Sequence, residues 1–540
     1  MKKKSVAKRF GAALLAALLA LACASCSPAD SGSSPAGAEG SKADAGGEST
    51  PADDGGSDGD VVTLKMFVEP TWWDYHDWSG RIPEIATEKT GVDFEVTVAA
   101  DANALNMMIA SGDMGDIVVA ESIARMNDGN ICYDLDSLAE QYNMDLSDIG
   151  EVMRFVNTAD DGKLYSILVG FSPDKVMEEY EAVLEGEGLV CRTDILEELN
   201  VKETDINSLA DFEELLGKVK ENYPDMVPVI WGSSNECRVP NILFGARREN
   251  DGFIVQDGQL YTFIEDPKMK DVYMTLNRWY RNGYITAENF SFSTGSEDLE
   301  YFVSGKAFAN IAYGSTAENW NETEFPKAGV DFTVTQMVSI FNDPNAEFIQ
   351  RNPGWRGLYI PKSCSDPEAA LRFCLWAWSD EGRHTLLWGE EGVDWNWSED
   401  HTYPELNYNF ENPNEEDGMK YWGWTCHNGY DNTAPQKSSA GSTLDAYTKL
   451  TSILRMDPIV GGLRVPPDSD ESVIMNNLED LEKNERVNIV TAATEEEALA
   501  AYDNMIAMAK EMGSDKLVEW AMPKWQERQA AYDEIKDSPN

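Results

Sequence analysis

The stretch Val61-Val62-Thr63-Leu64-Lys65-Met66-Phe67-Val68 alternates apolar and polar side chains over most of its length, which predicts a β-strand with one buried face. Outward from it, the pattern predicts a helix over 81–90 and a second alternating strand over 92–98. A helix capped by an aspartate is expected over 101–111, and the apolar run 117–120 suits a strand buried on both faces. Strand, helix, strand, helix and strand in this order predict a βαβ unit with a parallel sheet.

The same kinds of element recur further along the chain. Helices are predicted over 209–220, from Pro367 to 380 and over 494–512, and strands over 227–231 and 306–312. The chain beyond residue 60 exceeds the roughly 250–300 residues at which a single core stops growing. We therefore predict an α/β protein of two lobes, with the chain passing between them more than once.

The first 23 residues predict export and a lipid anchor. A basic head is followed by an apolar run over 11–22, which is too short to span a bilayer, and then by Cys23. This pattern predicts a lipoprotein signal peptide over 1–22, lipidation at Cys23 and a location at the extracytoplasmic face of a membrane. An ordinary cleaved signal, or lipidation at Cys26, are the alternatives. Residues 23–60 read as a disordered acidic Gly/Ser linker, because they offer almost nothing apolar to bury.

Composition excludes several classes of partner. The formal net charge of −53 disfavours nucleic acid as a ligand, because the surface repels phosphates. The six cysteines of the folded part form no CxxC pair and the four histidines are scattered, so no zinc site is predicted. These cysteines are expected to be mostly buried thiols, with one or two disulfides left open. The sequence predicts no cofactor and no metal.

Short motifs spread along the chain resemble those of a known family. They are Ile109-Ala110-Ser111-Gly112-Asp113-Met114-Gly115-Asp116-Ile117, Asp161-Gly162-Lys163-Leu164-Tyr165, Arg192-Thr193-Asp194-Ile195-Leu196, Gly305-Lys306-Ala307, Ile360-Pro361-Lys362, Pro367-Glu368-Ala369-Ala370, Glu381-Gly382 and Trp388-Gly389-Glu390-Glu391-Gly392-Val393. In this order, the chain resembles extracellular solute-binding protein family 1, the carbohydrate-binding lipoproteins of ABC importers. Residues 221–228 lack the ligands of the calcium loop found in this branch, so no calcium is expected there. Residues 396–486 match poorly.

The resemblance implies a two-lobe periplasmic-binding-protein-like (type II) fold with a hinge and an interlobe cleft. Lobe 1 is expected over 61–170 plus about 355–400, and lobe 2 over 171–354 plus about 401–540. It also implies a monomeric receptor that closes around an oligosaccharide and delivers it to ABC transporter permease subunits, without catalysis.

Aromatic and polar side chains near predicted strand ends are the candidate sugar ligands. Aromatic faces pack on pyranose rings, and carboxylates accept hydrogen bonds from hydroxyls. Clefts of α/β sheets open at strand ends, which selects the residues there. The candidates are Trp72, Trp73, Glu121, Trp231, Tyr313, Trp320 and Trp355. Trp73→Ala or Trp231→Ala is expected to lower affinity without unfolding the protein. Trp422 and Trp424 are weaker candidates for a cleft rim.

Two other functions stay open from the sequence. A receptor for a peptide or another non-sugar solute would have the same fold and anchor. A secreted glycoside hydrolase or lyase is less favoured, because any chain with 96 acidic residues contains some suitable carboxylate pair and no catalytic motif occurs. The sequence does not reveal the identity, linkage or length of the sugar.

Overall fold

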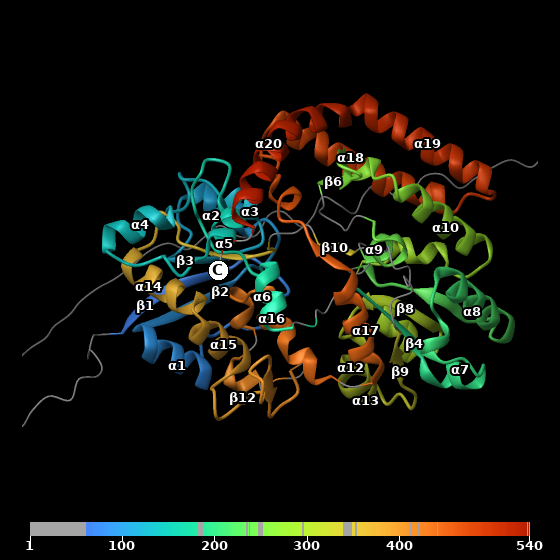
Figure 1. Ribbon diagram of the computed structural model, residues 1–540, viewed down its shortest axis with the longest axis horizontal. Helices are drawn as coiled ribbons and strands as arrows, with labels where there is room; N and C mark the ends of the chain where they lie inside the picture. The colour runs from blue at the N-terminus through green and yellow to red at the C-terminus, as the bar shows by residue number, and fades with distance from the viewer. Residues whose placement is uncertain are drawn as a thin grey trace, which may run out of the picture. The chain divides into compact units, whose positions relative to one another are not determined.

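The computed structural model of the protein is shown in Figure 1. It describes residues 61–181, 183, 187–233, 236, 238–246, 252–293, 296–337, 348–350, 354–410, 413, 415–419, 421–439, 441–536 and 538. The predicted signal peptide, the lipidation site Cys23 and the linker up to residue 60 lie outside the described residues. In the part of the chain that is described, no helix combines the length and the apolar character that crossing a membrane requires.

The first sheet has the strand order β11-β3-β1-β2. Strand β1 (Val62–Val68) pairs in parallel with β2 (Val92–Val98) and with β3 (Ile117–Ala120), whereas β11 (Gly357–Tyr359) runs antiparallel to β3. The predicted parallel βαβ unit is therefore confirmed. A strand from far along the chain completes the sheet.

Helices cover both faces of this first sheet, which explains the short apolar run of β3. Ile117 and Val119 pack in the core shared with α1 (Arg81–Thr90), α4 (Leu135–Tyr142) and α14 (Pro367–Trp378). Val118 and Ala120 point into the other core, with α2 (Ala104–Ser111) and α3 (Ile123–Met126). All four residues of β3 are fully buried, as expected of a strand covered on two sides.

Two predicted helices differ at their ends because polar side chains bond the backbone there. Helix α2 begins at Ala104, since the Asp101 carboxylate accepts a 2.8 Å hydrogen bond from the Asn103 backbone and forms a turn before the helix. The helix predicted from Pro367 to 380 is interrupted after Trp378. Ser379 is extended there, and its hydroxyl accepts from the Gly382 backbone to cap a new helix, α15 (Asp380–Trp388).

The second sheet has the strand order β5-β8-β4-β9. Strand β8 (Ala307–Tyr313) is parallel to β5 (Val227–Ile230) and antiparallel to β4 (Glu187–Arg192), which is also antiparallel to β9 (Val334–Gln336). Its larger core includes helix α10 (Met269–Arg281) and the three C-terminal helices α18 (Asp470–Val490), α19 (Glu495–Met512) and α20 (Ser514–Ile535). Figure 1 shows α18 and α19 lying side by side, and the two helices contact one another.

A short ribbon connects the two sheets. After β9 the chain forms β10 (Phe348–Gln350), which pairs in parallel with β14 (Leu454–Met456), and then enters the first sheet at β11. The C-terminal helix α20 adds a further contact, because its Tyr532 ring lies 5.5 Å from that of Phe155 on α5 (Glu151–Asn157) of lobe 1.

Residues following 400 correct the predicted lobe boundary. We expected lobe 2 to include 401–540, but Met419, Trp422 and Cys426 are buried in the core of the first sheet. A second aromatic cluster joins Trp388 of α15 to Trp395 and Tyr430. It holds the hairpin of β12 (Trp395–Trp397) and β13 (Pro404–Leu406) together with α16 (Gly429–Thr433). The segment up to about residue 435 therefore belongs to lobe 1.

The remaining described helices and strands complete the structure. They are α6 (Asp174–Glu179), α7 (Thr193–Glu198), α8 (Leu209–Asn222), α9 (Arg238–Phe244), β6 (Phe253–Gln256), β7 (Gln259–Thr262), α11 (Glu297–Val303), α12 (Thr316–Asn319), α13 (Phe325–Ala328) and α17 (Gly441–Ile453). Short helical turns with three to five residues complete the set. The five described cysteines of the folded part, Cys132, Cys191, Cys364, Cys374 and Cys426, are buried free thiols.

Candidate ligand-binding site

One edge of the first sheet gathers three chain segments. In the register, Val68 of β1 lies opposite Val119 of β3, and Ala120 lies opposite Gly357 of β11. Because β11 runs antiparallel to β3, the residues before Gly357 emerge beside those that follow Val68 and Ala120. The sheet topology thus places Glu69, Glu121 and Arg356 at a common edge.

Trp72 forms an aromatic platform at this edge. Of the sixteen tryptophans, all of them among the described residues, Trp72 alone is exposed, with 46% of its surface accessible. Its ring stacks on Trp355, with centroids 6.4 Å apart and planes at 23°, and meets the edge of Trp424 at 6.2 Å. We call these three residues the tryptophan platform. A stacked, half-exposed indole can pack against the C–H face of a sugar ring.

Arg356 lies buried beneath the tryptophan platform. Its guanidinium carbon is 3.8 Å from the ring centroid of Trp355, 4.9 Å from that of Trp73 and 5.1 Å from that of Trp72. Cation–π attraction stabilises this arrangement. None of the three guanidinium nitrogen atoms has a hydrogen-bond partner among the described residues, and burial lowers the pKa of Arg356 to about 9. Such a buried charge is costly and calls for an opposite charge nearby.

Glu121 supplies that opposite charge. One of its carboxylate oxygens, Oε1, lies 4.0 Å from Nε of Arg356, and its side chain also forms a hydrogen bond with Trp72. Burial raises the pKa of Glu121, and the positive charge of Arg356 opposes this rise. The backbone is fixed by Glu69, whose Oε2 accepts hydrogen bonds from the N–H groups of Glu121 at 2.7 Å and of Ser122 at 2.9 Å.

The support behind the tryptophan platform is apolar. Trp73 is only 1% exposed, and its ring contacts those of Tyr421 at 6.1 Å and Trp422 at 5.7 Å. Trp73 therefore belongs to the core and holds Arg356 and Trp72 in place. It does not itself offer a face to a ligand.

A buried histidine lies near the same cation. Nδ1 of His427 is 2.7 Å from the carbonyl oxygen of Asn428. Burial lowers the pKa of His427 to about 4, and the nearby charge of Arg356 acts in the same direction. His427 is therefore neutral at pH 7, and it adds no positive charge beneath the tryptophan platform.

The candidates of the second sheet are dispersed. Trp231 is 1% exposed, its carbonyl accepts a hydrogen bond from Asn289, and its ring meets Phe290 at 5.9 Å. Trp231 lines a separate pocket of about 500 Å³ between α10 and α18. Tyr313 ends β8 and lies 4.5 Å beneath the guanidinium of Arg238. Trp320 is 6% exposed, and Phe302 and Phe325 pack against its ring, so it belongs to the core.

The structure thus unites four of the seven predicted site residues, Trp72, Trp73, Glu121 and Trp355, around one cation. Sequence reasoning missed Arg356, although this residue directly follows Trp355 and precedes a strand. It also underrated Trp424, because the chain around it resembled no family motif. Among the described residues, no cluster of three or more His, Cys, Asp or Glu side chains is arranged to hold a metal ion.

Sequence comparison leaves this chain without a match: no family model and no curated protein matches it. Solved structures do match. The alginate-binding protein AlgQ2 without calcium ion has a TM-score of 0.63 at 17% identity, over 86% of this chain and 98% of that one. The N-glycan transport solute-binding protein of Streptococcus pneumoniae has a TM-score of 0.58 at 16% identity, over 86% and 98%.

A third similar structure is the S. pneumoniae ABC-transporter substrate-binding protein FusA in complex with kestose. Its TM-score is 0.63 at 14% identity, over 87% of this chain and all of that one (100%). These three proteins are named for binding or transport. At such low identity the similarity establishes the fold, which is the two-lobe, periplasmic-binding-protein-like fold of solute-binding proteins, as the sequence predicted.

Proposed function

We propose that this protein is a member of extracellular solute-binding protein family 1. In this proposal it is a lipid-anchored receptor that binds an oligosaccharide outside the cytoplasm and delivers it to the permease of an ABC importer. The observation that carries the proposal is the tryptophan platform, with its single exposed indole beside the pair of Glu121 and Arg356. The similar solute-binding proteins, whose names mention alginate, N-glycans and kestose, support a carbohydrate ligand.

The chemistry of the tryptophan platform suits a sugar. Trp72 offers a flat apolar face, and the carboxylate of Glu121 accepts hydrogen bonds from hydroxyl groups. The unsatisfied N–H groups of Arg356 donate to a hydroxyl oxygen once the platform rearranges around a ligand. Because the two charges neutralise each other, this pair favours a neutral polyol over an ion.

Delivery to a permease requires a conformational change of the receptor that the transporter recognises. The ribbon of β10 and β14 between the lobes is short and could act as the hinge. A ligand that contacts both lobes would favour the conformation in which they are closed around it. Lipidation at Cys23 and the linker up to residue 60 would keep the receptor near the membrane. This part of the proposal rests on the sequence and on the fold.

The proposal is tested by thermal unfolding of the full chain with a panel of oligosaccharides and, in parallel, of short peptides. A ligand that binds only the folded state raises the melting temperature. Trp72→Ala should lower the affinity for the stabilising sugar at least about tenfold, whereas Trp520→Ala, a half-buried tryptophan on α20, should leave it unchanged. Stabilisation by peptides alone, or equal affinity in both variants, would contradict the sugar site.

A further inference from the structure

A second acidic side chain, Glu69, lies at the same sheet edge as Glu121. Glu69 directly follows β1, and its backbone N–H donates a 2.9 Å hydrogen bond to the carbonyl oxygen of Val119, which continues the pairing of β1 with β3. The next residue is Pro70, which restricts the backbone of Glu69 to extended conformations. The side chain of Glu69 therefore starts from a well-fixed backbone.

The carboxylate of Glu69 accepts three hydrogen bonds from the turn that follows β3. Its Oε2 atom accepts from the backbone N–H groups of Glu121 at 2.7 Å and of Ser122 at 2.9 Å, and its Oε1 atom accepts from the hydroxyl of Ser122. Hydrogen bonds to an ionised carboxylate are roughly twice as strong as those between neutral groups. Both oxygen atoms of Glu69 are thus used inside the protein, whereas the side chain of Glu121 is 38% exposed and open to a ligand.

Ser122 shows that this turn depends on Glu69. Ser122 stands at the N-cap of α3, where a serine hydroxyl commonly accepts a hydrogen bond from the backbone of the first helical turn. Within α3, which is fully described, the hydroxyl makes no such bond and donates to Glu69 instead. A helix of four residues also adds little stability of its own. The start of α3 is therefore held from outside the helix.

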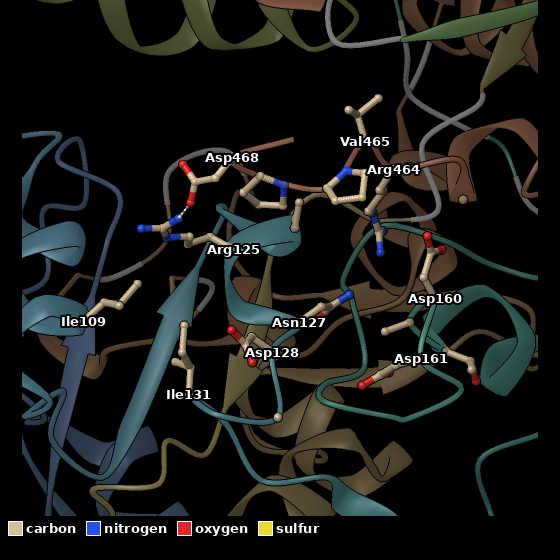
Figure 2. A pocket seen from close by; sticks show the side chains of 17 residues that line it. Ile109, Arg125, Asn127, Asp128, Ile131, Asp160, Asp161, Arg464, Val465 and Asp468 are labelled. Atoms are coloured by element: carbon tan, nitrogen blue, oxygen red, sulfur yellow. Dashed lines mark hydrogen bonds and ion pairs between the residues drawn. The ribbon is translucent and has the colours of Figure 1, made fainter. Parts of the chain in front are cut away.

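The contacts at the far end of α3 do not replace Glu69. Met126 is fully buried and anchors that end in the core. Arg125 forms a 2.9 Å ion pair with Asp468 of the segment 462–468, as Figure 2 shows. Because the side chain of Asp468 is 86% exposed, this ion pair contributes little. Both contacts lie beyond the turn of Glu121, so the position of that turn depends on Glu69.

The position of the turn matters because Glu121 joins two parts of the candidate site. Its carboxylate faces Arg356 at 4.0 Å and forms a hydrogen bond with Trp72. Trp72 itself lies three residues after Glu69 in the same loop. One carboxylate thus connects the loop that carries the exposed indole to the turn that carries the polar ligand group. A shift of the turn would separate the groups that are proposed to contact the sugar.

We propose that Glu69 is a positioning residue of the sugar site, which holds Glu121 in place through its backbone and does not itself contact the sugar. The inference rests on the proposed function and adds to it a division of roles. Of two neighbouring glutamates, one meets the ligand and the other sets the geometry of the first.

The test is calorimetric titration of the full chain with tetrasaccharides of linear glucan, mannan and fructan. Glu69→Ala removes the three hydrogen bonds and should lower the affinity for the sugar that binds about tenfold or more. In Glu69→Gln the amide can accept from the two N–H groups and donate to the hydroxyl of Ser122, so the affinity at pH 7 should stay within about threefold. Glu95→Ala, which removes an exposed glutamate of β2 in the same sheet, is the matched control and should change nothing.

A pH profile distinguishes this role from a purely structural one. Burial raises the pKa of Glu121, the charge of Arg356 opposes this rise, the charge of Glu69 adds to it, and the hydrogen bond with Trp72 opposes it. His427, near Arg356, has a pKa of about 4 and titrates alike in both proteins. Glu69→Gln removes a negative neighbour and should lower the pKa of Glu121. The loss of sugar affinity in acid should therefore begin at a lower pH than in the unchanged protein.

The outcomes separate this inference from the proposed function. If the unchanged protein binds none of the sugars, both fail. If sugars bind and Trp72→Ala weakens them, but Glu69→Ala leaves the affinity unchanged, the positioning role is wrong and the receptor stands. Equal losses in Glu69→Ala and Glu69→Gln would mean that the carboxylate itself contacts the sugar, which contradicts the inference. Should circular dichroism show that Glu69→Ala is unfolded, the pH profile of Glu69→Gln decides, and a profile identical to that of the unchanged protein overturns the inference.

Discussion

Trp72 and Trp231 both follow strands at the carboxyl edge of a sheet, yet one is exposed and the other is buried. After β1 the chain forms an open loop that leaves the indole of Trp72 accessible and stacked on Trp355. After β5 the chain is covered by Asn289 and Phe290 and by the start of α9. The strand end fixes the position of the backbone, and the segments that cover it decide whether the side chain can meet a ligand.

The largest expected effect is on the stability of lobe 2. Trp231→Ala should lower the free energy of unfolding by about 3–5 kcal/mol, because it empties a fully buried site. This replaces the expectation, drawn from sequence, that the variant keeps its fold and loses affinity. Urea unfolding measures the change, with Trp279→Ala, another fully buried tryptophan of lobe 2, as the matched control. A stable Trp231→Ala protein with at least tenfold weaker sugar binding would show that Trp231 binds the ligand and is not a core residue.

The second effect is a loss of stability at low pH, caused by the buried histidine His427 of lobe 1. The pKa of His427 is about 4 in the folded state, against about 6.5 for an unperturbed histidine. Between these values the unfolded chain takes up a proton that the folded protein does not, so stability is lost as the pH falls from about 6.5 to 4. The loss should reach at most about 3 kcal/mol.

His427→Gln isolates this histidine from the many carboxylates that also titrate in acid. The difference in unfolding free energy between the variant and the unchanged protein should vary over the same pH range and be flat above pH 7, as urea titrations at several pH values would reveal. A constant difference across the range would mean that His427 is not buried in its neutral form.

The third effect is on binding. Glu121→Gln removes the charge that faces Arg356, but folding raises the pKa of Glu121, so the neutral side chain should not lower the free energy of unfolding. Affinity for the sugar should fall, because the amide of glutamine offers one acceptor oxygen where the carboxylate offers two. Thermal unfolding and calorimetric titration measure the two quantities, and Glu390→Gln, at another arginine, is the control.

The raised pKa of Glu121 adds a pH signature to the same variant. A carboxyl group whose pKa is raised by folding holds its proton more tightly in the folded state, so its contribution to stability grows as the pH falls. Sugar affinity moves the other way, because the protonated group accepts fewer hydrogen bonds. As the pH is lowered, the sugar affinity should begin to fall above the ordinary pKa of glutamate, which is about 4.3. The Glu121→Gln variant should not show this fall.

Only a small loss of stability is expected for the exposed member of the comparison. Trp72→Ala should lower the free energy of unfolding by only about 1 kcal/mol, because nearly half of the side chain is already in water. Chemical denaturation of this variant beside Trp231→Ala gives the contrast directly. Equal losses in the two variants would show that both tryptophans are structural.

The fold was largely predictable from sequence, because its strands carry clear patterns. Strands β1, β2 and β3 appear within one residue of their predicted bounds, since alternation or a short apolar run defines each of them. Helix α15 was not separated from α14, because the break depends on the conformation of Ser379. The part of the chain from 401 to about 435 was assigned to the wrong lobe, because its aromatic residues do not reveal which core they enter.

The candidate site was predictable only in part. A rule that selects aromatic residues at strand ends found Trp72 and Trp355, but it also found Trp231 and Trp320, which are buried. No local pattern marks Arg356, because its importance comes from three tryptophan rings brought together from two distant segments and from Glu121, which follows β3. Spatial convergence of this kind has no signal in one sequence.

The return of the chain to the first sheet has a consequence for the order of folding. Leu358 of β11 pairs with Val119 of β3 across about 240 residues of intervening chain. The four strands of the second sheet, by contrast, all lie between Glu187 and Gln336. As the chain emerges from its N-terminus, the four strands of the second sheet can pair while β3 of the first sheet still has an unpaired edge, although the core of the second sheet still lacks α18, α19 and α20. The unpaired strand β3 ends at Ala120, directly before Glu121, so an incomplete chain exposes a strand open to aggregation beside the residues of the candidate site.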